Sequence, residues 1–336
     1  MKKIISSIAA LACIALIAAG CTAKKETAAA PSAKTYRIGI TKIVAHPALD
    51  AVEKGVQDEI ASRGISATFD LQNANGDVNT ATQIATKFET DGVDAVVAIA
   101  TPTAVAAVNA IKDKPVIFSV ITDPIGAGLV TTLAHGEGNV TGVSDKTDIL
   151  QHLTLFAKVA KIKTLGYIYT SSEANSASSK ADVEAACAKL GIVLVSQSIN
   201  NSSEVKQATS AIISRVDGIY LTTDNTVFSA LPALIEVALA GKKPVFSSDV
   251  TSALEGGCLI ASGFDYYKAG RATGVILADV LGGKAPSAIP VKFMTAASES
   301  DLLLDLDVAK ICGITFPKEL LDSASKIIEN GKLTTK

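Results

Sequence analysis

A strand-and-turn phrase that occurs twice limits the folds open to this chain. Residues 114–128 read KPVIFSVITDPIGAG and residues 243–249 read KPVFSSD, so each begins with Lys-Pro and runs through apolar residues to an acid. A second phrase is also duplicated, as DAVVAIATPT in residues 94–103 and DGIYLTTDNT in residues 217–226. Short continuous apolar runs are typical of buried strands in parallel sheets. The duplication therefore predicts two similar halves.

Apolar strand-like segments alternate with helix-like segments through both halves. The order is β-α-β-α-β-α-β from residue 36 to residue 121, and the alternation resumes from residue 163 to residue 264. Such alternation implies right-handed βαβ crossovers and a mostly parallel sheet in each half. We predict an α/β fold of two doubly wound parallel-sheet lobes joined by a hinge. Residues 139–145 (NVTGVSD), extended in character and containing glycine, are the expected first hinge crossing.

Length, charge and cysteine use exclude several classes of protein. The 336 residues are enough for two domains of ordinary size. With 31 basic and 33 acidic residues and no long block of one sign, no nucleic-acid partner is expected. The cysteines lack CxxC spacing and the three histidines are dispersed, which argues against a metal site, a disulfide framework or a cofactor. Cys187, Cys258 and Cys312 are expected to be buried free thiols.

The N-terminus has the features of a secretory signal. Met1-Lys2-Lys3 precedes a mostly apolar run, residues 4–19, which is too short for a membrane-spanning helix. The run leads into Ala-Ala-Gly-Cys at residues 18–21, which resembles a bacterial lipobox, and the resemblance implies cleavage after residue 20 and lipidation of Cys21. The alternative is an ordinary cleavage site beside an unmodified cysteine. Residues 21–35, polar and rich in alanine, are the expected flexible tether to an anchor on the extracytoplasmic face of the membrane.

Polar residues gather after the predicted strands, at the edge where open α/β sheets bind ligands. Helix starts there can accept an anionic group, and aspartates can accept an ammonium or hydroxyl donor. A cleft with both functions matches an α-amino acid or a similar zwitterion, and His46 and Tyr266 can cover its side chain. The same residues can instead be helix caps, turn formers or packing residues. The candidates are Thr101, Thr103, Asn175 and Ser176 at helix starts, and Asp123, Asp224, Asp249 and Asp265 after strands.

Catalytic motifs are missing from the sequence. It has no GxSxG, P-loop or HExxH motif, and no histidine stands beside a candidate nucleophile. Acids without a partner base or nucleophile favour ligand recognition over catalysis. We therefore expect a binding protein and not an enzyme.

Segments spread along the mature chain resemble the ABC transporter substrate-binding proteins, in the group that includes receptors for tryptophan and other aromatic amino acids. They are LQNANGD (71–77), IATPTA (99–104), VITDPIGAGLV (120–130), NVTGVSD (139–145), SEANS (172–176), TDNT (223–226) and GFDYYKAG (263–270). The resemblance implies a type I periplasmic binding protein with three hinge crossings, which closes over its ligand and delivers it to a permease with an ATPase. It marks as ligand contacts Thr101, Asp123, Asn175, Ser176, Asp224, Asn225 and Asp265.

The expected organisation follows from both lines of reasoning. Residues 1–20 are the signal peptide, 36–143 with about 265–291 form lobe 1, and 144–264 with about 292–330 form lobe 2. The expected function is a lipid-anchored solute receptor of an ABC importer that binds an apolar or aromatic amino acid between its lobes. Residues 247–257 (SSDVTSALEGG) depart from the acidic pattern of the family, so the identity of the ligand does not follow from the resemblance. A nucleoside or sugar receptor of the same fold, or a sensor that transports nothing, are the alternatives.

Overall fold

The computed structural model describes residues 34–294 and 297–336. Cys21, the expected signal peptide and nearly all of the expected tether lie outside these residues. The described strands form one sheet of six strands and one of eight, with helices packed on them, which confirms the predicted α/β fold. No helix in the described part of the chain is both long and apolar enough to cross a membrane. We call the first sheet with its helices lobe 1, and the second with its helices lobe 2.

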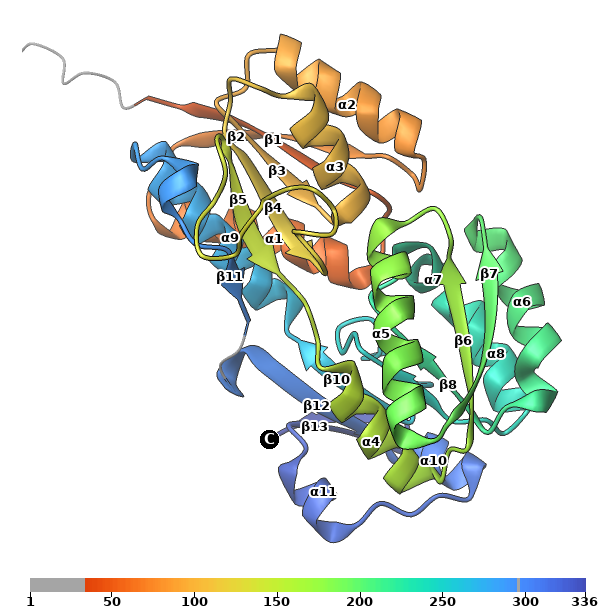
Figure 1. The fold of residues 1–336 in the computed structure, drawn as a ribbon. Coiled ribbons are helices and arrows are strands. Elements are labelled where there is room, and N and C mark those ends of the chain that lie inside the picture. The colour runs from red at the N-terminus through yellow and green to blue at the C-terminus, as the bar shows by residue number, and fades with distance from the viewer. Residues whose placement is uncertain (1–33, 295–296) are drawn as a thin grey trace, which may run out of the picture. The chain divides into compact units, whose positions relative to one another are not determined.

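The sheet of lobe 1 is entirely parallel. Helices α1 (Pro47–Ser62) and α9 (Tyr266–Leu281) lie together on one face, and α2 (Val78–Thr90) and α3 (Thr101–Ala110) on the other (Figure 1). Helices on both faces are what a doubly wound sheet requires. In spatial order the strands are β11 (Lys292–Phe293), β5 (Val140–Ser144), β4 (Val116–Ile121), β3 (Ala95–Ile99), β1 (Tyr36–Lys42) and β2 (Ala67–Asn73).

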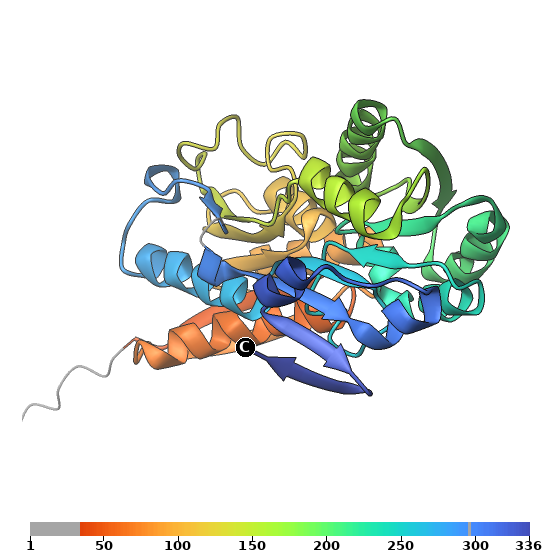
Figure 2. The same ribbon diagram turned by 90° about the horizontal axis from the view of Figure 1, so that it is seen from below.

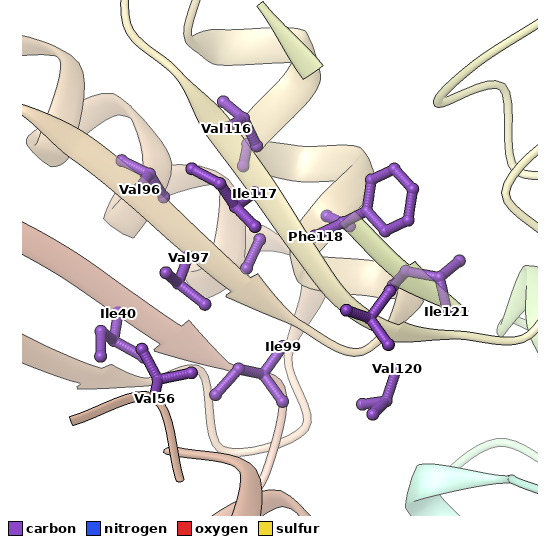
Figure 3. Packing of buried hydrophobic residues seen from close by; sticks show 14 of the residues in the cluster. Ile40, Val56, Val96, Val97, Ile99, Val116, Ile117, Phe118, Val120 and Ile121 are labelled. Carbon is purple, nitrogen blue, oxygen red and sulfur yellow. The ribbon is translucent and has the colours of Figure 1, made fainter. Parts of the chain in front are cut away.

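The apolar runs that predicted these strands form the core of lobe 1. Every residue of β3, β4 and β5 is buried. Side chains such as Val97, Ile99 and Ile117 pack against Ile40 of β1 and Val56 of α1 (Figure 3). Each fully buried aliphatic side chain contributes about 1.5–3 kcal/mol to folding, so the sheet holds the strand ends in fixed positions.

Helices α1 and α9 approach each other so closely that only glycine fits at the contact. A Cβ atom on Gly55 would lie 2.3 Å from the carbonyl oxygen of Tyr267, and one on Gly270 would lie 2.2 Å from that of Val52. The two backbones are therefore in direct contact. Because α9 packs on α1 in this way, the N-terminus of α9 is held at the carboxyl edge of the sheet.

The sheet of lobe 2 is mixed: β10 pairs with β12 and β13 pairs with β14 in antiparallel fashion, and the other pairs are parallel. Helices α4 (Ile149–Ala160) and α5 (Ala174–Leu190) share one core cluster, and α6 (Val205–Ile212) and α8 (Leu231–Ala240) share another. The strands in spatial order are β14 (Lys332–Thr335), β13 (Lys326–Glu329), β12 (Ser300–Asp305), β10 (Ile260–Phe264), β9 (Val245–Ser247), β8 (Gly218–Leu221), β6 (Thr164–Thr170) and β7 (Val193–Ile199).

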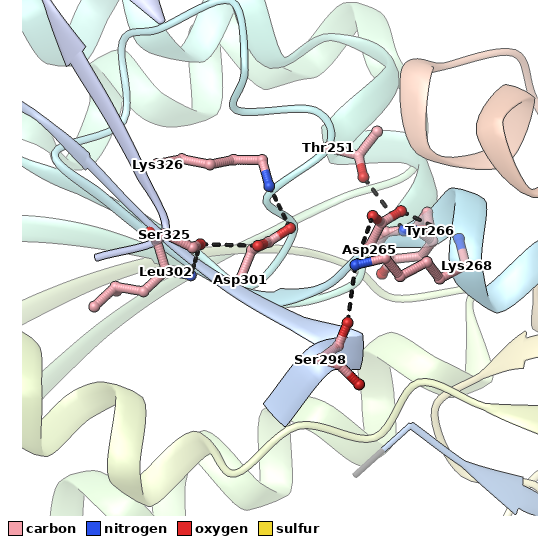
Figure 4. A network of polar contacts seen from close by, with 9 residues as sticks. All are labelled: Thr251, Asp265, Tyr266, Lys268, Ser298, Asp301, Leu302, Ser325 and Lys326. Carbon is pink, nitrogen blue, oxygen red and sulfur yellow. Dashed lines mark hydrogen bonds and ion pairs between the residues drawn. The ribbon is translucent and has the colours of Figure 1, made fainter. Parts of the chain in front are cut away.

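The sequence did not predict α4 or the strands after residue 300. For α4 the signal was present, because Ile149, Leu153 and Phe156 are buried at helical spacing. The strands β12, β13 and β14 carry charged residues, and the last two form a hairpin at the sheet edge (Figure 2). In Figure 4, Asp301 binds Lys326 at 2.5 Å and the Ser325 hydroxyl at 2.8 Å. Polar links thus hold these strands where apolar patterning is weak.

The described chain passes between the sheets three times: after β5, after β10 and after β11. The last passage lies between Phe293 and Ser300, a few residues beyond the expected boundary near residue 291. The short helices α7 (Asn225–Ser229), α10 (Leu306–Cys312) and α11 (Lys318–Ser323) complete lobe 2. Cys187 and Cys258 are buried and Cys312 is half-buried, each as a free thiol.

Candidate ligand-binding site

Strand ends and helix starts from both lobes line one pocket. Its free volume is about 20 Å³, which is close to the ~10–15 Å³ that one water molecule needs. A larger ligand can therefore enter only if the walls of the pocket separate. The lining residues are His46, Leu49, Ala100, Thr101, Val120, Thr122, Asp145, Asn175, Thr223, Asn225, Phe228, Asp249 and Tyr266.

The structure brings only some of the sequence-based candidates to this pocket. Those that line it are His46, Thr101, Asn175, Asn225, Asp249 and Tyr266. The others, Thr103, Asp123, Ser176, Asp224 and Asp265, are not among the lining residues and have partners elsewhere.

Thr103 and Asp265 have the local roles that the sequence left as alternatives. The Thr103 hydroxyl donates to the carbonyl oxygens of Ile99, at 2.6 Å, and Ala100, at 2.9 Å. The Asp265 carboxylate caps α9 by accepting from the backbone N–H of Lys268 at 3.1 Å (Figure 4). These contacts explain both residues by helix structure alone.

Asp224 lies behind the pocket wall as the centre of a hydrogen-bond cluster in lobe 2. It accepts from the backbone and hydroxyl of Thr170 at 2.6 and 2.8 Å, and from the Ser176 hydroxyl at 2.6 Å. It also caps α7 through the N–H of Val227 at 3.0 Å. Burial, together with the nearby Glu173 carboxylate, raises the pKa of Asp224 to about 7. Its carboxylate therefore joins β6, α5 and α7 and has no acceptor capacity directed at the pocket.

Two contacts join the lobes beside the pocket. The Thr122 and Thr223 hydroxyls lie 2.7 Å apart. The Ser178 hydroxyl of α5 donates to Asp123, in the turn after β4, at 2.9 Å. Asp123 also accepts from the backbone N–H of Gly126 at 2.9 Å. Asp123 therefore connects the two lobes, and it is not among the residues that line the pocket.

Two buried carboxylates give the pocket its charge. Asp145 accepts from the hydroxyls of Thr122 and Tyr266, each at 3.1 Å. Asp249 accepts from the backbone N–H of Ser252 at 3.0 Å and from its hydroxyl at 2.5 Å. Burial raises the pKa of each carboxyl to about 6. Among the described residues no lysine or arginine lines the pocket, so the site favours a cationic group.

Some polar atoms in the pocket are buried without a partner in the described chain. They are the side-chain oxygen of Asn175 and both ring nitrogens of His46. Burial lowers the pKa of His46 to about 4, so the ring is neutral at pH 7. Leaving such a group unpaired costs about 1–3 kcal/mol, and a bound ligand would remove that penalty. The His46 and Phe228 rings both line the pocket, with their centroids 6.1 Å apart and their planes inclined by 31°.

Two helix N-termini and two strained residues border the same space. No side chain of the described structure caps α1 or α3, whose N-cap residues, His46 and Ala100, both line the pocket. Uncapped N–H groups at a positive dipole end suit a carboxylate. Ala100, with φ 77° and ψ 157°, and Val120, with φ 54°, have backbone angles that side chains disfavour. Such strain, about 1–3 kcal/mol per residue, concentrates at ligand sites.

A known protein family matches nearly the whole described chain. The family described as ABC transporter substrate binding protein matches residues 37–328. The chain belongs to this family. The resemblance drawn from its sequence segments is thus confirmed. Substrate-binding proteins of ABC transporters work outside the cytoplasm with a membrane permease and are in general not enzymes.

Three relatives of this substrate-binding protein are informative. A protein of Clostridioides difficile (strain R20291) named tyrosine-binding protein is 37% identical over 320 residues, 92% of each chain. A structure from Streptococcus pneumonia, described as an ABC domain in complex with L-Trp, is 33% identical, with a TM-score of 0.83 over 88% of this chain and 100% of that one. The ligand-free, open structure of a Clostridium difficile substrate binding protein with adhesive properties is 34% identical, with a TM-score of 0.65 over 88% and 99%.

In the described part of this substrate-binding protein, no group of three or more His, Cys, Asp or Glu residues is arranged to hold a metal ion. The pocket residues that the sequence missed include Asp145, Thr223 and Phe228. Asp145 is the last residue of the segment NVTGVSD, and Thr223 is the first residue of the segment TDNT. Both segments carried the family resemblance, so the sequence contained a signal for these two residues. Phe228 is preceded by the predicted turn and had no distinguishing signal of its own.

Proposed function

We propose that this protein binds an α-amino acid with an aromatic or large apolar side chain, as the receptor of an ABC importer. The observation that carries the proposal is that one pocket contains both groups that suit a cation and groups that suit an anion. The buried carboxylates of Asp145 and Asp249 and the unpartnered oxygen of Asn175 suit an ammonium group. The uncapped N-termini of α1 and α3 suit a carboxylate.

The side chain of the ligand would lie against His46 and Phe228, which supply a neutral, mostly apolar surface. The names of the relatives support this choice, since one is a tyrosine-binding protein and another was solved with L-Trp. A nucleoside or a sugar offers hydroxyl donors but no cation, so it would leave both carboxylates without a counter-charge.

Opening and closing of the lobes would admit the ligand. The small free volume, the hydrogen bond between the Thr122 and Thr223 hydroxyls, and the hydrogen bond from Ser178 to Asp123 fit a closed arrangement. At nearly equal identity, the TM-score is 0.83 with the L-Trp complex and 0.65 with the ligand-free, open structure. Closure over the ligand would bury it and present one defined surface to the permease.

A ligand screen tests the proposal. Protein lacking residues 1–21 is unfolded and refolded to remove any bound ligand, and its melting temperature is then measured with amino acids, nucleosides and sugars. Since a ligand at a hundred times its Kd stabilises the folded state by about 2.7 kcal/mol, we expect a clear rise with tryptophan, tyrosine or phenylalanine. A rise with nucleosides or sugars alone would overturn the ligand class, and no rise with any of them would favour the sensor.

The pocket carboxylates predict how binding depends on pH. The folded state raises the pKa of Asp145 and Asp249 to about 6, so their contribution to stability is complete below about pH 4 and is lost as pH rises through 6. Burial lowers the pKa of His46 and His152 to about 4. Their contribution to the stability of the folded state is therefore complete above about pH 6.5 and is lost as the pH falls toward 4. Binding of an ammonium group needs ionised carboxylates.

We therefore expect the ligand-induced rise in melting temperature to shrink between pH 7 and pH 5. Melting curves with and without tryptophan, recorded across that range, separate this effect from the change in the unliganded protein. A ligand-induced rise that stays constant down to pH 5 would show that neither carboxylate binds the ammonium group.

We also propose that Cys21 carries the lipid anchor. In the sequence it directly follows the signal-like residues 1–20. Replacing Cys21 with serine should move the protein from the membrane fraction to the soluble fraction, because a serine cannot be thioether-linked to lipid. Fractionation of cells expressing either form measures this, with Cys187→Ser as the matched control. Retention of the Cys21→Ser form in membranes would refute the anchor.

A further inference from the structure

Glu173 is a buried carboxylate that lies just behind the pocket without lining it. It precedes α5 and is 4% exposed. Its oxygens accept hydrogen bonds from the side-chain nitrogen of Asn175 at 3.0 Å and from that of Asn225 at 2.6 Å. They also accept from the backbone N–H groups of Asn225 and Thr226, at 3.3 and 3.1 Å, and from the Thr226 hydroxyl at 2.7 Å. Glu173 thus ties the start of α5 to the start of α7.

These contacts determine which way the two amides face. An ionised carboxylate can only accept hydrogen bonds, so each asparagine must turn its NH₂ group toward Glu173. The Asn175 NH₂ group also donates to the carbonyl oxygen of Thr223 at 2.9 Å. A flipped Asn175 would place its own oxygen against two acceptors. The Asn175 oxygen therefore faces away, and it is buried with no partner in the described chain.

We propose that Glu173 is a positioning residue that sets the hydrogen-bond polarity of the pocket. By holding the NH₂ groups of Asn175 and Asn225, it turns both amide oxygens away from itself, and the Asn175 oxygen, which has no partner in the described chain, is left for the ligand. With the carboxylates of Asp145 and Asp249, the polar wall then offers acceptors and selects a ligand rich in donors. This inference rests on the proposed function, and it makes Glu173 a determinant of the preference for an α-ammonium group over an α-hydroxyl group.

The variant Glu173→Gln tests this, because glutamine has nearly the same shape but can also donate. One or both asparagine amides could then flip and present NH₂ to the ligand. Calorimetric titration measures the affinity for L-tryptophan and for indole-3-lactate, in which a hydroxyl replaces the ammonium group. We expect Glu173→Gln to lower the affinity for tryptophan at least tenfold and the preference for it over indole-3-lactate at least fivefold. Glu184→Gln, on the exposed face of α5, is the matched control.

The ratio of the affinities for tryptophan and indole-3-lactate distinguishes a positioning role of Glu173 from a general loosening of the pocket. A pocket that is only loosened loses affinity for both compounds alike, so an unchanged ratio in a folded Glu173→Gln protein overturns the inference and leaves the proposed function standing. Failure of the unaltered protein to bind tryptophan or another amino acid would instead overturn the proposed function. If circular dichroism shows that Glu173→Gln does not fold, Asn175→Ala removes the positioned oxygen directly. An unchanged ratio in that variant would also overturn the inference.

Discussion

Replacement of Asp249 by asparagine is expected to reduce the affinity for an aromatic amino acid about a hundredfold while leaving the protein folded. The carboxylate is buried in the pocket and has no counter-charge from a lysine or arginine among the described lining residues. Loss of one partner of a buried, hydrogen-bonded charge pair costs about 2–5 kcal/mol, and 1.4 kcal/mol corresponds to a factor of ten in Kd. Titration calorimetry with tryptophan measures the loss.

Folding should tolerate this substitution for a separate reason. Burial disfavours the ionised form of Asp249, which is why its pKa rises to about 6. Asparagine is isosteric and neutral, and its oxygen can still accept from the N–H of Ser252. Asp265→Asn, at the cap of α9, is the matched control, since Asp265 does not line the pocket. Equal binding by Asp249→Asn and the unaltered protein would remove Asp249 from the site.

The sequence could predict the sheets of the two lobes because buried parallel strands read as continuous apolar runs. The duplicated phrases correspond to β3 and β4 in lobe 1 and to β8 and β9 in lobe 2. Their ends supply Thr101, Asn225 and Asp249 to the pocket. The strands β12 to β14, at one end of the sheet, were missed because charged residues interrupt their apolar pattern and side-chain pairs such as Asp301 with Lys326 hold them.

The sequence could not separate ligand contacts from helix caps, for a physical reason. Both roles use Asp, Asn, Ser and Thr at the same place, directly after a strand. Asp224 and Asp249 follow the neighbouring strands β8 and β9, yet only Asp249 lines the pocket, because four donors from β6, α5 and α7 surround Asp224. The strained conformations of Ala100 and Val120 leave no trace in residue type, since glycine is what a positive φ ordinarily predicts.

Replacement of Gly270 by alanine is expected to lower the free energy of unfolding by about 2 kcal/mol, although alanine is the better helix former. Within α9 the change gains about 1 kcal/mol of helix propensity. Against this, the new Cβ would lie 2.2 Å from the carbonyl oxygen of Val52, and the obstacle is backbone that cannot rotate away. Forcing extra atoms into a packed contact typically costs 1–3 kcal/mol and occasionally more. Here the steric penalty exceeds the propensity gain.

The same substitution should also weaken ligand binding, because α1 and α9 begin at the pocket with His46 and Tyr266. Separating the helices would move both side chains, whereas Asp249→Asn changes affinity alone. Urea unfolding and titration with tryptophan measure the two effects, and Val275→Ala, at an exposed position of α9, is the control with little expected change. If Gly270→Ala were as stable as the unaltered protein, α1 and α9 could not be in backbone contact, and the placement of Tyr266 at the pocket would need another cause.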